Sequence, residues 1–453
     1  MKEIILILFS IVVLNASMTI QQDKGLSLLE ALEVLNSNNL EIQAASIDVD
    51  SAKAKEDSVS GNHWGKLEFI QDFANSNDAG NVFGFKLASR EATFGDFGFS
   101  EFDSTNPNIL TVMPQDLNYP DARNFFQSKL KYEVPLFTGF QLSSYSDIMK
   151  SMTRMKSLDK DKVINEKIYE LRKSYYDMAL LSSSIQNLNT ILENITKLEN
   201  ITNEMIEVGY AKKVDLLEVQ AKKGNVERLV SKMQYNQKLL YHYISFLLNQ
   251  EVRNIEIPST NVEMIDISDE EILTNNLDIK KATEGLEVRR SMTEVSKSAY
   301  YPMVGAFAEV GTADNSFLGD AADHASYTVG ARLSWNIFNG GIDSAKIQEA
   351  KLNQLKTESQ VQLAHHGIKL KIAKIRTEIE TYDSDVISLQ KELKLSNAIY
   401  KNYEGRYKEK LSSMSDVIIK QSEQIKKVLQ LQQALNKRNE RIFALEKLAN
   451  GDK

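Results

Sequence analysis

The sequence contains no cysteine and only six prolines and 20 glycines among 453 residues. The absence of cysteine excludes disulfides, thiolate metal sites, a cysteine nucleophile and lipid attachment to an N-terminal cysteine. Because proline and glycine interrupt helices, their scarcity favours long uninterrupted helices. The net charge of −8 argues against a broad nucleic-acid-binding surface, so no nucleic-acid partner is expected.

Long hydrophobic runs are also missing after the first residues. Segment 4–14 is apolar except for Ser10, follows Lys2, and precedes the small residues Ala16 and Ser17. A membrane anchor is the alternative, but a spanning helix needs about 20 apolar residues, so the run predicts a secretory signal peptide at residues 1–19. No later segment is apolar over 18 residues. Any membrane insertion is therefore expected to use strands.

The chain repeats itself at an offset of 201 residues. Segment 134–139 recurs as 335–340, and segment 209–215 recurs as 410–416. These matches predict two structural repeats, residues 20–257 and 258–453. The opening segments of the repeats, 26–42 and 271–279, are instead offset by 237 residues, which assigns 36 extra residues to the first repeat. They fall in segment 75–124, which is predicted to be a long loop between two strands, without helical periodicity.

Two segments alternate between apolar and polar residues. Residues 129–136 and 327–337 show this period of two, which predicts strands with one apolar face. Their partner strands are expected at 66–73 and 303–311. About ten residues per strand suits a tilted membrane strand, and a small soluble antiparallel sheet is the alternative.

The rest of each repeat has helical periodicity. Apolar residues at alternating spacings of three and four run from Ile164 to Leu198 and from Ile372 to Tyr407, which predicts coiled-coil packing. Helices are expected over 139–209 and 340–410, each roughly 100 Å long at about 1.5 Å per residue. Returning helices over 215–249 and 416–450 would complete two hairpins. Four strands cannot close a membrane barrel, so a membrane protein of this kind must oligomerise.

Three kinds of segment occur in both repeats: the strand-to-helix junctions 135–139 and 337–341, the hairpin tips 207–217 and 403–417, and the opening helices containing Asn39-Leu40 and Asn276-Leu277. In these segments the chain resembles the outer-membrane efflux family, the TolC-like exit ducts of Gram-negative bacteria. The resemblance covers nearly the whole mature chain, in the right order and twice. It implies a mainly α fold in which a long coiled-coil α-barrel continues into a 12-stranded β-barrel, formed by a trimer with four strands per chain. Asn336 replaces the proline of the first junction, and Lys410 replaces the glycine of the first tip. A different turn is therefore expected at the second tip.

The resemblance also implies a function. The chain is expected to be an outer-membrane channel that acts as the exit duct of a tripartite efflux or type I secretion system. The implied partners are two further copies of the chain, a periplasmic adaptor protein, an inner-membrane pump of the RND, ABC or similar class, and outer-membrane lipid. The helical part would lie in the periplasm. The alternative is a soluble periplasmic coiled-coil scaffold.

No enzymatic chemistry is expected. The sequence shows no P-loop, nucleotide-binding fold or catalytic Ser-His-Asp order, so no catalytic residue or cofactor is predicted. The five histidines lack metal-ligand spacing, so no metal site is predicted either.

The candidate functional residues lie at the two hairpin tips. By resemblance, Asp416 and Tyr407 line the periplasmic gate, and Asp215 is the acid at the corresponding position of the first tip. Three copies of Asp416 would form a carboxylate ring that favours cations, although the second acid expected from the family is Ile419 here. Capping of the returning helices is the alternative for both aspartates. By resemblance, an adaptor would dock on the tip residues, with a plain turn as the alternative: Gly209, Tyr210, Ala211, Lys410, Leu411 and Ser412.

Aromatic residues gather near the predicted strand ends. This set comprises Trp64, Tyr132, Tyr300, Tyr301, Tyr327 and Trp335. Such positions are typical of the interfacial aromatic belts of membrane barrels. For Trp335, burial between strand and helix is the alternative.

Overall fold

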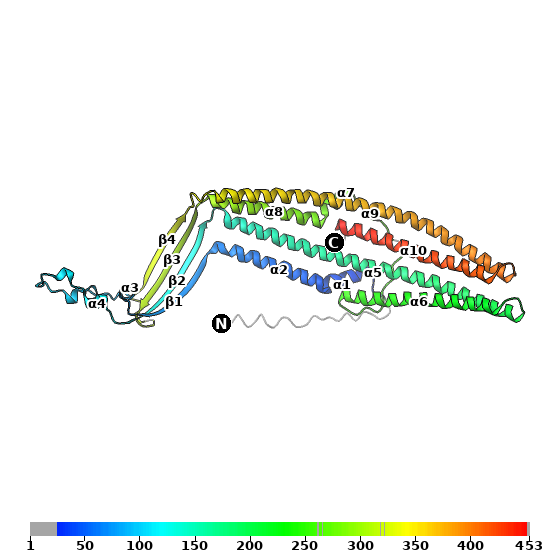
Figure 1. Cartoon of the computed structure of the whole chain (residues 1–453), viewed down its shortest axis with the longest axis horizontal. Coiled ribbons are helices and arrows are strands. Elements are labelled where there is room, and N and C mark those ends of the chain that lie inside the picture. The colour runs from blue at the N-terminus through cyan, green and yellow to red at the C-terminus, as the bar shows by residue number, and fades with distance from the viewer. Residues whose placement is uncertain (1–24, 261, 265, 318, 321, 451–453) are drawn as a thin grey trace. The chain divides into compact units, whose positions relative to one another are not determined.

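The computed structural model describes residues 25–260, 262–264, 266–317, 319–320 and 322–450 (Figure 1). The predicted signal peptide, residues 1–19, lies outside the described residues. The chain divides into two compact units. The helical unit contains the described residues up to Asp48, Ser157–Lys281 and those from Gln362 onward. The sheet unit contains Val49–Lys156 and Ala282–Val361.

A four-stranded antiparallel sheet forms the centre of the sheet unit. Its strands, in spatial order, are β1 (Lys66–Ser76), β2 (Arg123–Phe137), β3 (Met303–Asp314) and β4 (Ser326–Ser334) (Figure 1). The four predicted strands are thus confirmed, but β2 begins at Arg123 rather than at residue 129. The prediction that the last strand continues to residue 337 is wrong, because β4 ends at Ser334. Neighbouring strands are antiparallel, so all four connections to helices leave from one end of the sheet.

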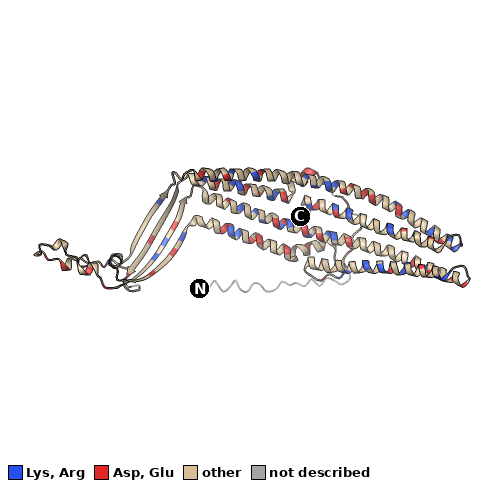
Figure 2. Cartoon of the chain, in the orientation of Figure 1, with Lys and Arg blue, Asp and Glu red and all other residues tan. Residues whose placement is uncertain are grey.

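The two faces of the sheet differ in chemistry. An apolar row crosses all four strands on one face: Leu67, Tyr132, Ala308 and Val329. The adjacent row lies on the opposite face and is polar: Glu68, Lys131, Glu309 and Thr328. Figure 2 shows positions of charged residues along the strands. The alternation predicted from the sequence therefore extends in register across the whole sheet.

Residues 77–122, here called the lobe, connect β1 to β2. The prediction of a loop without helical structure is wrong, because the lobe contains α3 (Ala79–Ala88), α4 (Gln115–Asn118) and 3-10 turns at Gly95–Phe97, Phe99–Glu101 and Ile109–Thr111. Asp78 caps α3 by accepting the Asn81 N–H at 3.0 Å. The ring of Phe85 stacks on that of Phe125 at 4.2 Å, which fastens α3 to β2.

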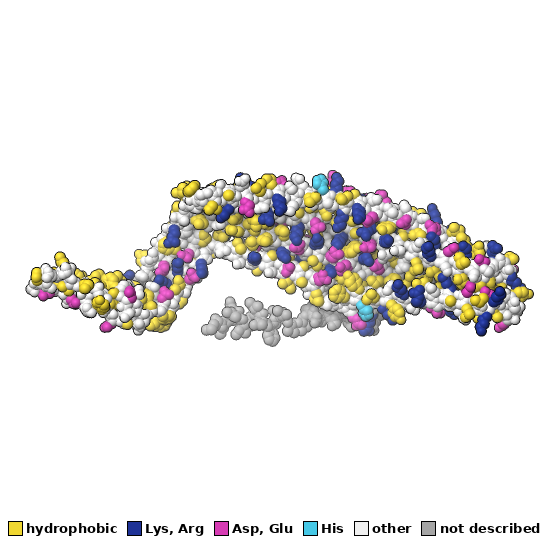
Figure 3. Space-filling view, in the orientation of Figure 1, with side chains coloured by type: hydrophobic (Ala, Val, Ile, Leu, Met, Phe, Trp, Pro, Cys, Tyr) yellow, Lys and Arg dark blue, Asp and Glu magenta, His cyan; other side chains and the backbone are white. Residues whose placement is uncertain are grey.

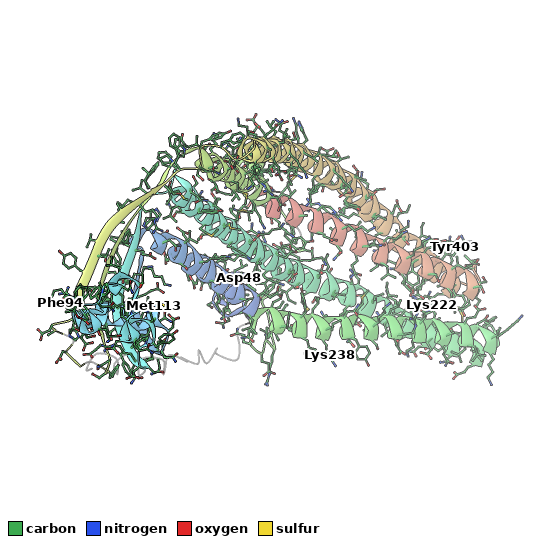
Figure 4. All side chains as sticks on the ribbon, turned by 60° about the vertical axis from the view of Figure 1, so that its left-hand side comes forward. Asp48, Phe94, Met113, Lys222, Lys238 and Tyr403 are labelled. Carbon is green, nitrogen blue, oxygen red and sulfur yellow. The ribbon has the colours of Figure 1, made fainter. Side chains whose placement is uncertain are left out.

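The lobe also exposes large apolar side chains. Phe94 is 82% exposed and Met113 is 79% exposed. Both lie on the lobe in Figure 4, and Figure 3 shows hydrophobic side chains over the same part of the molecule.

The helices follow the order predicted from the repeat. The first half contains α1 (Leu28–Asn38), α2 (Leu40–Gly61), a 3-10 turn (Asn62–Trp64), α5 (Gln141–Glu207) and α6 (Lys213–Leu248). The second half contains α7 (Asp269–Asn275), α8 (Leu277–Lys297), a 3-10 turn (Ser298–Tyr300), α9 (Ile342–Lys408) and α10 (Met414–Ala449). Helices α5 and α9 have 67 residues each, and α6 and α10 have 36 each. This equality agrees with two repeats, whose boundary at 257/258 stays a prediction.

The apolar stripes predicted for the long helices are buried in the helical unit. Ile372, Ile375 and Ile379 are at most 4% exposed, and Leu188 and Leu198 are fully buried. The mainly α fold with long hairpins and a small sheet is therefore confirmed. No helix in the described part of the chain has the length and apolar character needed to cross a membrane.

Two buried asparagines separate the opening helices. The prediction of one helix containing Asn39-Leu40 is wrong, because α1 ends before Asn39 and α2 begins after it, at Leu40. The Asn39 carboxamide oxygen accepts the N–H groups of Glu41 and Ile42, both at 3.0 Å, and its Nδ2 donates to the Leu247 carbonyl at 2.7 Å. Asn276 has the same role between α7 and α8 and donates to the Leu448 carbonyl at 3.2 Å. Each asparagine thus caps one helix and binds the end of another.

Candidate functional site at the hairpin tips

The turn between α5 and α6 has a left-handed residue. Gly209 has φ +78°, and its N–H donates to the Ile206 carbonyl at 3.0 Å. The Tyr210 N–H donates to the Met205 carbonyl at 2.8 Å. These bonds satisfy the free carbonyls at the end of α5, and glycine is the residue that adopts this conformation most easily.

The turn between α9 and α10 has the same geometry. Lys410 has φ +62°, its N–H donates to the Tyr407 carbonyl at 3.0 Å, and the Leu411 N–H donates to the Arg406 carbonyl at 2.7 Å. The expectation of a different turn at the second tip is therefore wrong. Lysine tolerates the left-handed conformation at a cost of about 1 kcal/mol, because the two hydrogen bonds and the flanking helices hold the backbone.

Both tip aspartates cap the returning helices. Asp215 accepts the Lys212 N–H at 2.8 Å. Asp416 accepts the Ser413 N–H at 3.1 Å and the Ser413 hydroxyl at 2.7 Å, and the Asp416 N–H donates back to Ser413 Oγ at 3.2 Å. The hydrogen bonds from Ser413, together with the nearby Arg406 guanidinium, lower the pKa of Asp416. Asp416 is half-exposed, so its capping contacts leave room for a second role.

Tyr407 lies inside the helical core. Its side chain is only 6% exposed, in a cluster with Ile195, Leu198 and Val417. Burial raises the pKa of Tyr407, and the nearby Thr202 hydroxyl opposes this shift. Tyr407 therefore contributes to the packing between the hairpins and is largely withdrawn from the surface of the single chain.

Direct contacts join the two hairpins near their tips, and the sequence did not predict them. The Lys410 ammonium lies 3.2 Å from the centre of the Tyr210 ring, a cation–π contact. The Ser415 hydroxyl donates to Glu218 at 3.0 Å, and the Lys222 ammonium donates to Ser422 at 2.7 Å. Figure 4 labels Lys222 on α6. These pairs come from corresponding regions of the two repeats, so the 201-residue offset was the signal that could have suggested them.

The Lys222 ammonium group is partly buried between the hairpins. Burial lowers the pKa of its ammonium group. A charged amine in this position requires the hydroxyl of Ser422 as a partner, because desolvation without hydrogen bonding is costly.

Apolar side chains cover the surface of both tips. The exposed members are Val208, Tyr210, Val214, Leu217, Leu411 and Ile419. Of the other predicted docking residues, Gly209 and Lys410 are exposed, whereas Ala211 and Ser412 are half-buried. Exposed apolar residues that surround a rigid turn form a surface suited to docking a protein. Among the described residues, no group of three or more His, Asp or Glu side chains is arranged to hold a metal ion.

Two side chains with polar groups, one from each helix of the second hairpin, are almost completely buried. Tyr400 is 1% exposed and Gln421 is fully buried. Within the part of the chain that the structure describes, the Tyr400 hydroxyl and the Gln421 carboxamide have no hydrogen-bond partner. Burial raises the pKa of Tyr400. Buried polar groups without hydrogen bonds reduce stability, by about 1–3 kcal/mol each.

Comparison with known proteins gives a family match and a fold. Residues 270–451 match the family model described as outer membrane efflux protein. No curated protein sequence matches the chain.

Solved structures share the fold over most of the chain. The structure of CusC, a protein that undergoes transmembrane channel formation, aligns with a TM-score of 0.79 at 13% identity, over 94% of this chain and 92% of that one. The Campylobacter jejuni CmeC outer membrane channel aligns with a TM-score of 0.72 at 15% identity, over 94% and 85%. The outer membrane protein VceC from Vibrio cholerae aligns with a TM-score of 0.74 at 14% identity, over 94% and 96%. The resemblance seen in the sequence is thus confirmed.

Proposed function

Because residues 270–451 match the outer membrane efflux protein family and the fold is that of outer-membrane channels, we propose that three copies of this chain form a passive exit duct in the outer membrane. The duct passes substrates from the periplasm or an inner-membrane pump to the exterior and carries out no chemistry itself. Efflux and type I secretion both fit this role.

The two-faced sheet is the observation that carries the proposal. Leu67, Phe69 and Val329 on the apolar face are 63%, 69% and 72% exposed in the single chain. A soluble sheet would bury such a face, whereas a lipid-facing sheet would present it to the membrane. The strands have 9 to 15 residues, enough to cross a bilayer at a tilt.

The open edges of the sheet require further copies of the chain. β1 and β4 each pair with a single strand among the described residues. Backbone groups along such edges cannot remain unpaired in lipid, so the edges must be joined between copies. Three copies of four strands give the 12-stranded barrel implied by the family resemblance. The charged row through Glu68, Lys131 and Glu309 would then line the interior.

An aromatic belt marks the end of the sheet that joins the helices. Trp64 is 80% exposed, Trp335 is 54% exposed, and Tyr300 and Tyr301 are also exposed. The Trp335 indole donates to the Tyr300 carbonyl at 3.3 Å. The alternative of a buried Trp335 is therefore wrong for the single chain. Exposed Trp and Tyr at one level fit the membrane–water boundary, with the helices in the periplasm.

The tips provide the periplasmic entrance and the docking surface in this proposal. The exposed apolar residues at both turns support docking of a periplasmic adaptor that connects the duct to a pump of the RND, ABC or similar class. The half-exposed carboxylate of Asp416 at the tip supports the proposal that three copies form a carboxylate ring at the entrance, while each copy also caps α10.

Paired cysteine substitutions test the membrane assignment, because the native chain has no cysteine. Leu67→Cys and Glu68→Cys place a thiol on opposite faces of β1. In outer membranes we expect a membrane-impermeant maleimide to label Glu68→Cys and leave Leu67→Cys protected. The native protein should remain in the membrane after an alkaline wash. After treatment with a chemical cross-linker it should migrate as a trimer in gel electrophoresis. Release by the wash, together with equal labelling of both thiols, would establish the soluble scaffold instead.

Conductance in planar bilayers tests the entrance ring. Asp416→Asn should lower cation selectivity, because it removes three charges from the ring. Ser413→Ala is the matched control, since it weakens the cap and keeps the charge. Equal effects of the two variants would assign Asp416 to capping alone.

A further inference from the structure

Helix α3 of the lobe lies on one particular face of the sheet. Side chains on a strand alternate between faces, so Phe125 of β2 shares the face of Lys131, here called the charged face. This face also carries Glu68 and Glu309. Because the ring of Phe85 stacks on that of Phe125 with 12° between the ring planes, α3 is held over the charged face. Figure 1 shows α3 at the end of the sheet opposite to the connections to the long helices.

An ion pair holds the end of α3 to the same face. Arg123 lies two residues before Phe125 and therefore points to the same side of β2. It forms an ion pair with Glu91, just beyond α3, and donates to Ser89 Oγ at 3.1 Å. The Arg123 side chain is 16% exposed and Ser89 is fully buried, so this contact is shielded from water. The aromatic stack and the ion pair together fix α3 at two points.

Burial along the charged face shows how far α3 covers it. Ala313 of β3 pairs with Gln127 on this face and is 2% exposed, as is Val82 of α3. Helix α3 lies against both β2 and β3. Glu133, nearer the long helices on the same face, is exposed. The lobe therefore covers the far end of the charged face, which under the proposed function lines the barrel interior at the outer exit.

The other side of α3 is uncovered. Val82, Phe85 and Ser89 recur at helical spacing on the side towards the sheet, so Gly84 and Leu87 lie on the opposite side. Leu87 is 50% exposed. Apart from α3 itself, nothing in the described part of the chain lies within 4 Å of the position that a Cβ at Gly84 would take. In a barrel, this side of α3 would face the central axis.

We propose that the lobes of three copies pack against one another inside the outer mouth of the duct and close it. This inference rests on the proposed function, because only a ring of copies places the charged faces around one axis. Strand β1 leads directly into the lobe and is an edge strand that must pair with a neighbouring copy, so the nearest surface to each lobe is the next lobe. Contacts between lobes would also cover Phe94 and Met113, which are exposed in the single chain (Figure 4).

The dimensions of the mouth agree with closure by three helices. Twelve strands about 4.8 Å apart and tilted by about 40° enclose a ring about 24 Å across between backbones. A helix with its side chains is about 10–12 Å wide, and three such helices side by side fill a circle about 22–26 Å across. Three copies of α3 therefore fill the mouth. A substrate passes only after α3 leaves the charged face, which breaks the aromatic stack and the ion pair.

Labelling from outside intact cells tests whether the lobes close the mouth. A maleimide attached to a large polymer can reach Glu68→Cys, on the charged face near the long helices, only through the outer exit. We expect labelling to be about tenfold faster after Phe85→Ala, because loss of the stack and of its buried area weakens the closed state. Phe73→Ala is the matched control, since the Phe73 ring lies 5.4 Å from that of Phe126 of β2, on the opposite face, and it should leave the rate unchanged.

Cross-linking tests the contacts between lobes and does not depend on how Phe85→Ala folds. A short, membrane-permeable bis-maleimide should join Leu87→Cys between copies and leave Leu67→Cys unlinked, since Leu67 faces outward on the barrel. In a protein that passes the alkaline-wash and trimer tests, equal labelling rates with and without Phe85→Ala, or no cross-linking of Leu87→Cys, would overturn the closure by lobes. Release by the wash and absence of a trimer would instead overturn the proposed function itself.

Discussion

Removing the buried asparagines at the opening of each repeat should destabilise the helical unit by a calculable amount. Both Asn39 and Asn276 are 3% exposed. Alanine at either position removes a helix cap, which costs about 1 kcal/mol. It also leaves the carbonyl of Leu247 or Leu448 without its partner, which costs about 1–3 kcal/mol for a buried acceptor. The expected loss is about 2–4 kcal/mol per site.

The two repeats provide an internal comparison. The hydrogen bonds of Asn39 measure 2.7 to 3.0 Å, whereas those of Asn276 measure 3.1 to 3.2 Å. Asn39→Ala should therefore cost more than Asn276→Ala. Serine caps helices but is too short to reach the second carbonyl, so Asn39→Ser should recover about 1 kcal/mol of the loss.

Thermal or denaturant unfolding followed by helical circular dichroism measures these differences. Asn36→Ala is the control, because Asn36 is exposed in α1, and it should leave the unfolding midpoint nearly unchanged. If Asn39→Ala and Asn36→Ala shifted the midpoint equally, the asparagine junctions would be incidental to stability and the reasoning would be refuted.

Other substitutions in the helical unit have opposite expected signs. Tyr400→Phe should stabilise the protein by about 1 kcal/mol, since the buried Tyr400 hydroxyl has no described partner. Tyr175→Phe should destabilise it, because the Tyr175 hydroxyl donates to the Leu26 carbonyl. Unfolding midpoints distinguish the two variants. Under the proposed function, Tyr210→Ala should favour an open entrance by about threefold, because an exposed cation–π contact with Lys410 contributes about 0.5–1 kcal/mol. A double-mutant cycle with Lys410→Gln, read from single-channel open times, should show this coupling and would give none if the contact were incidental. Burial raises the pKa of Asp177, so the native state binds a proton there at a higher pH than the unfolded chain and gains stability as the pH falls. Asp177→Asn should therefore stabilise the protein near pH 7 and have no effect near pH 3. Equal effects on the unfolding midpoint at both pH values would contradict the burial argument.

Periodic patterns in the sequence predicted the repeated architecture correctly. Apolar residues at helical spacing predicted both hairpins, because a helix of this length must bury one continuous stripe. Alternation predicted the strands, because side chains on a strand point to opposite faces in turn. The helices of the lobe were not predicted by this reasoning. Helix α3 is held partly by the aromatic stack of Phe85 on Phe125, a contact between distant segments that no local pattern reveals.

The candidate site was predicted in part. The sequence placed Asp215 and Asp416 at the tips and kept open the capping role that the structure shows for both. It suggested that Lys410 changes the second turn, whereas the backbone there repeats the first. The contact of Lys410 with Tyr210 depends on how two hairpins about 200 residues apart in sequence pack together.

What the sequence determined by itself is therefore the set of elements: two hairpins of equal length, four strands and one long insertion. These follow from periodicity and from the offset of 201 residues, which are local or internal properties of the chain. Only the tertiary structure decided which polar groups meet. The burial of Asn39 against Leu247, of Tyr407 among core side chains, and of His324 beside Asp314 arises from residues brought together by folding, and their energies depend on distance and exclusion of water.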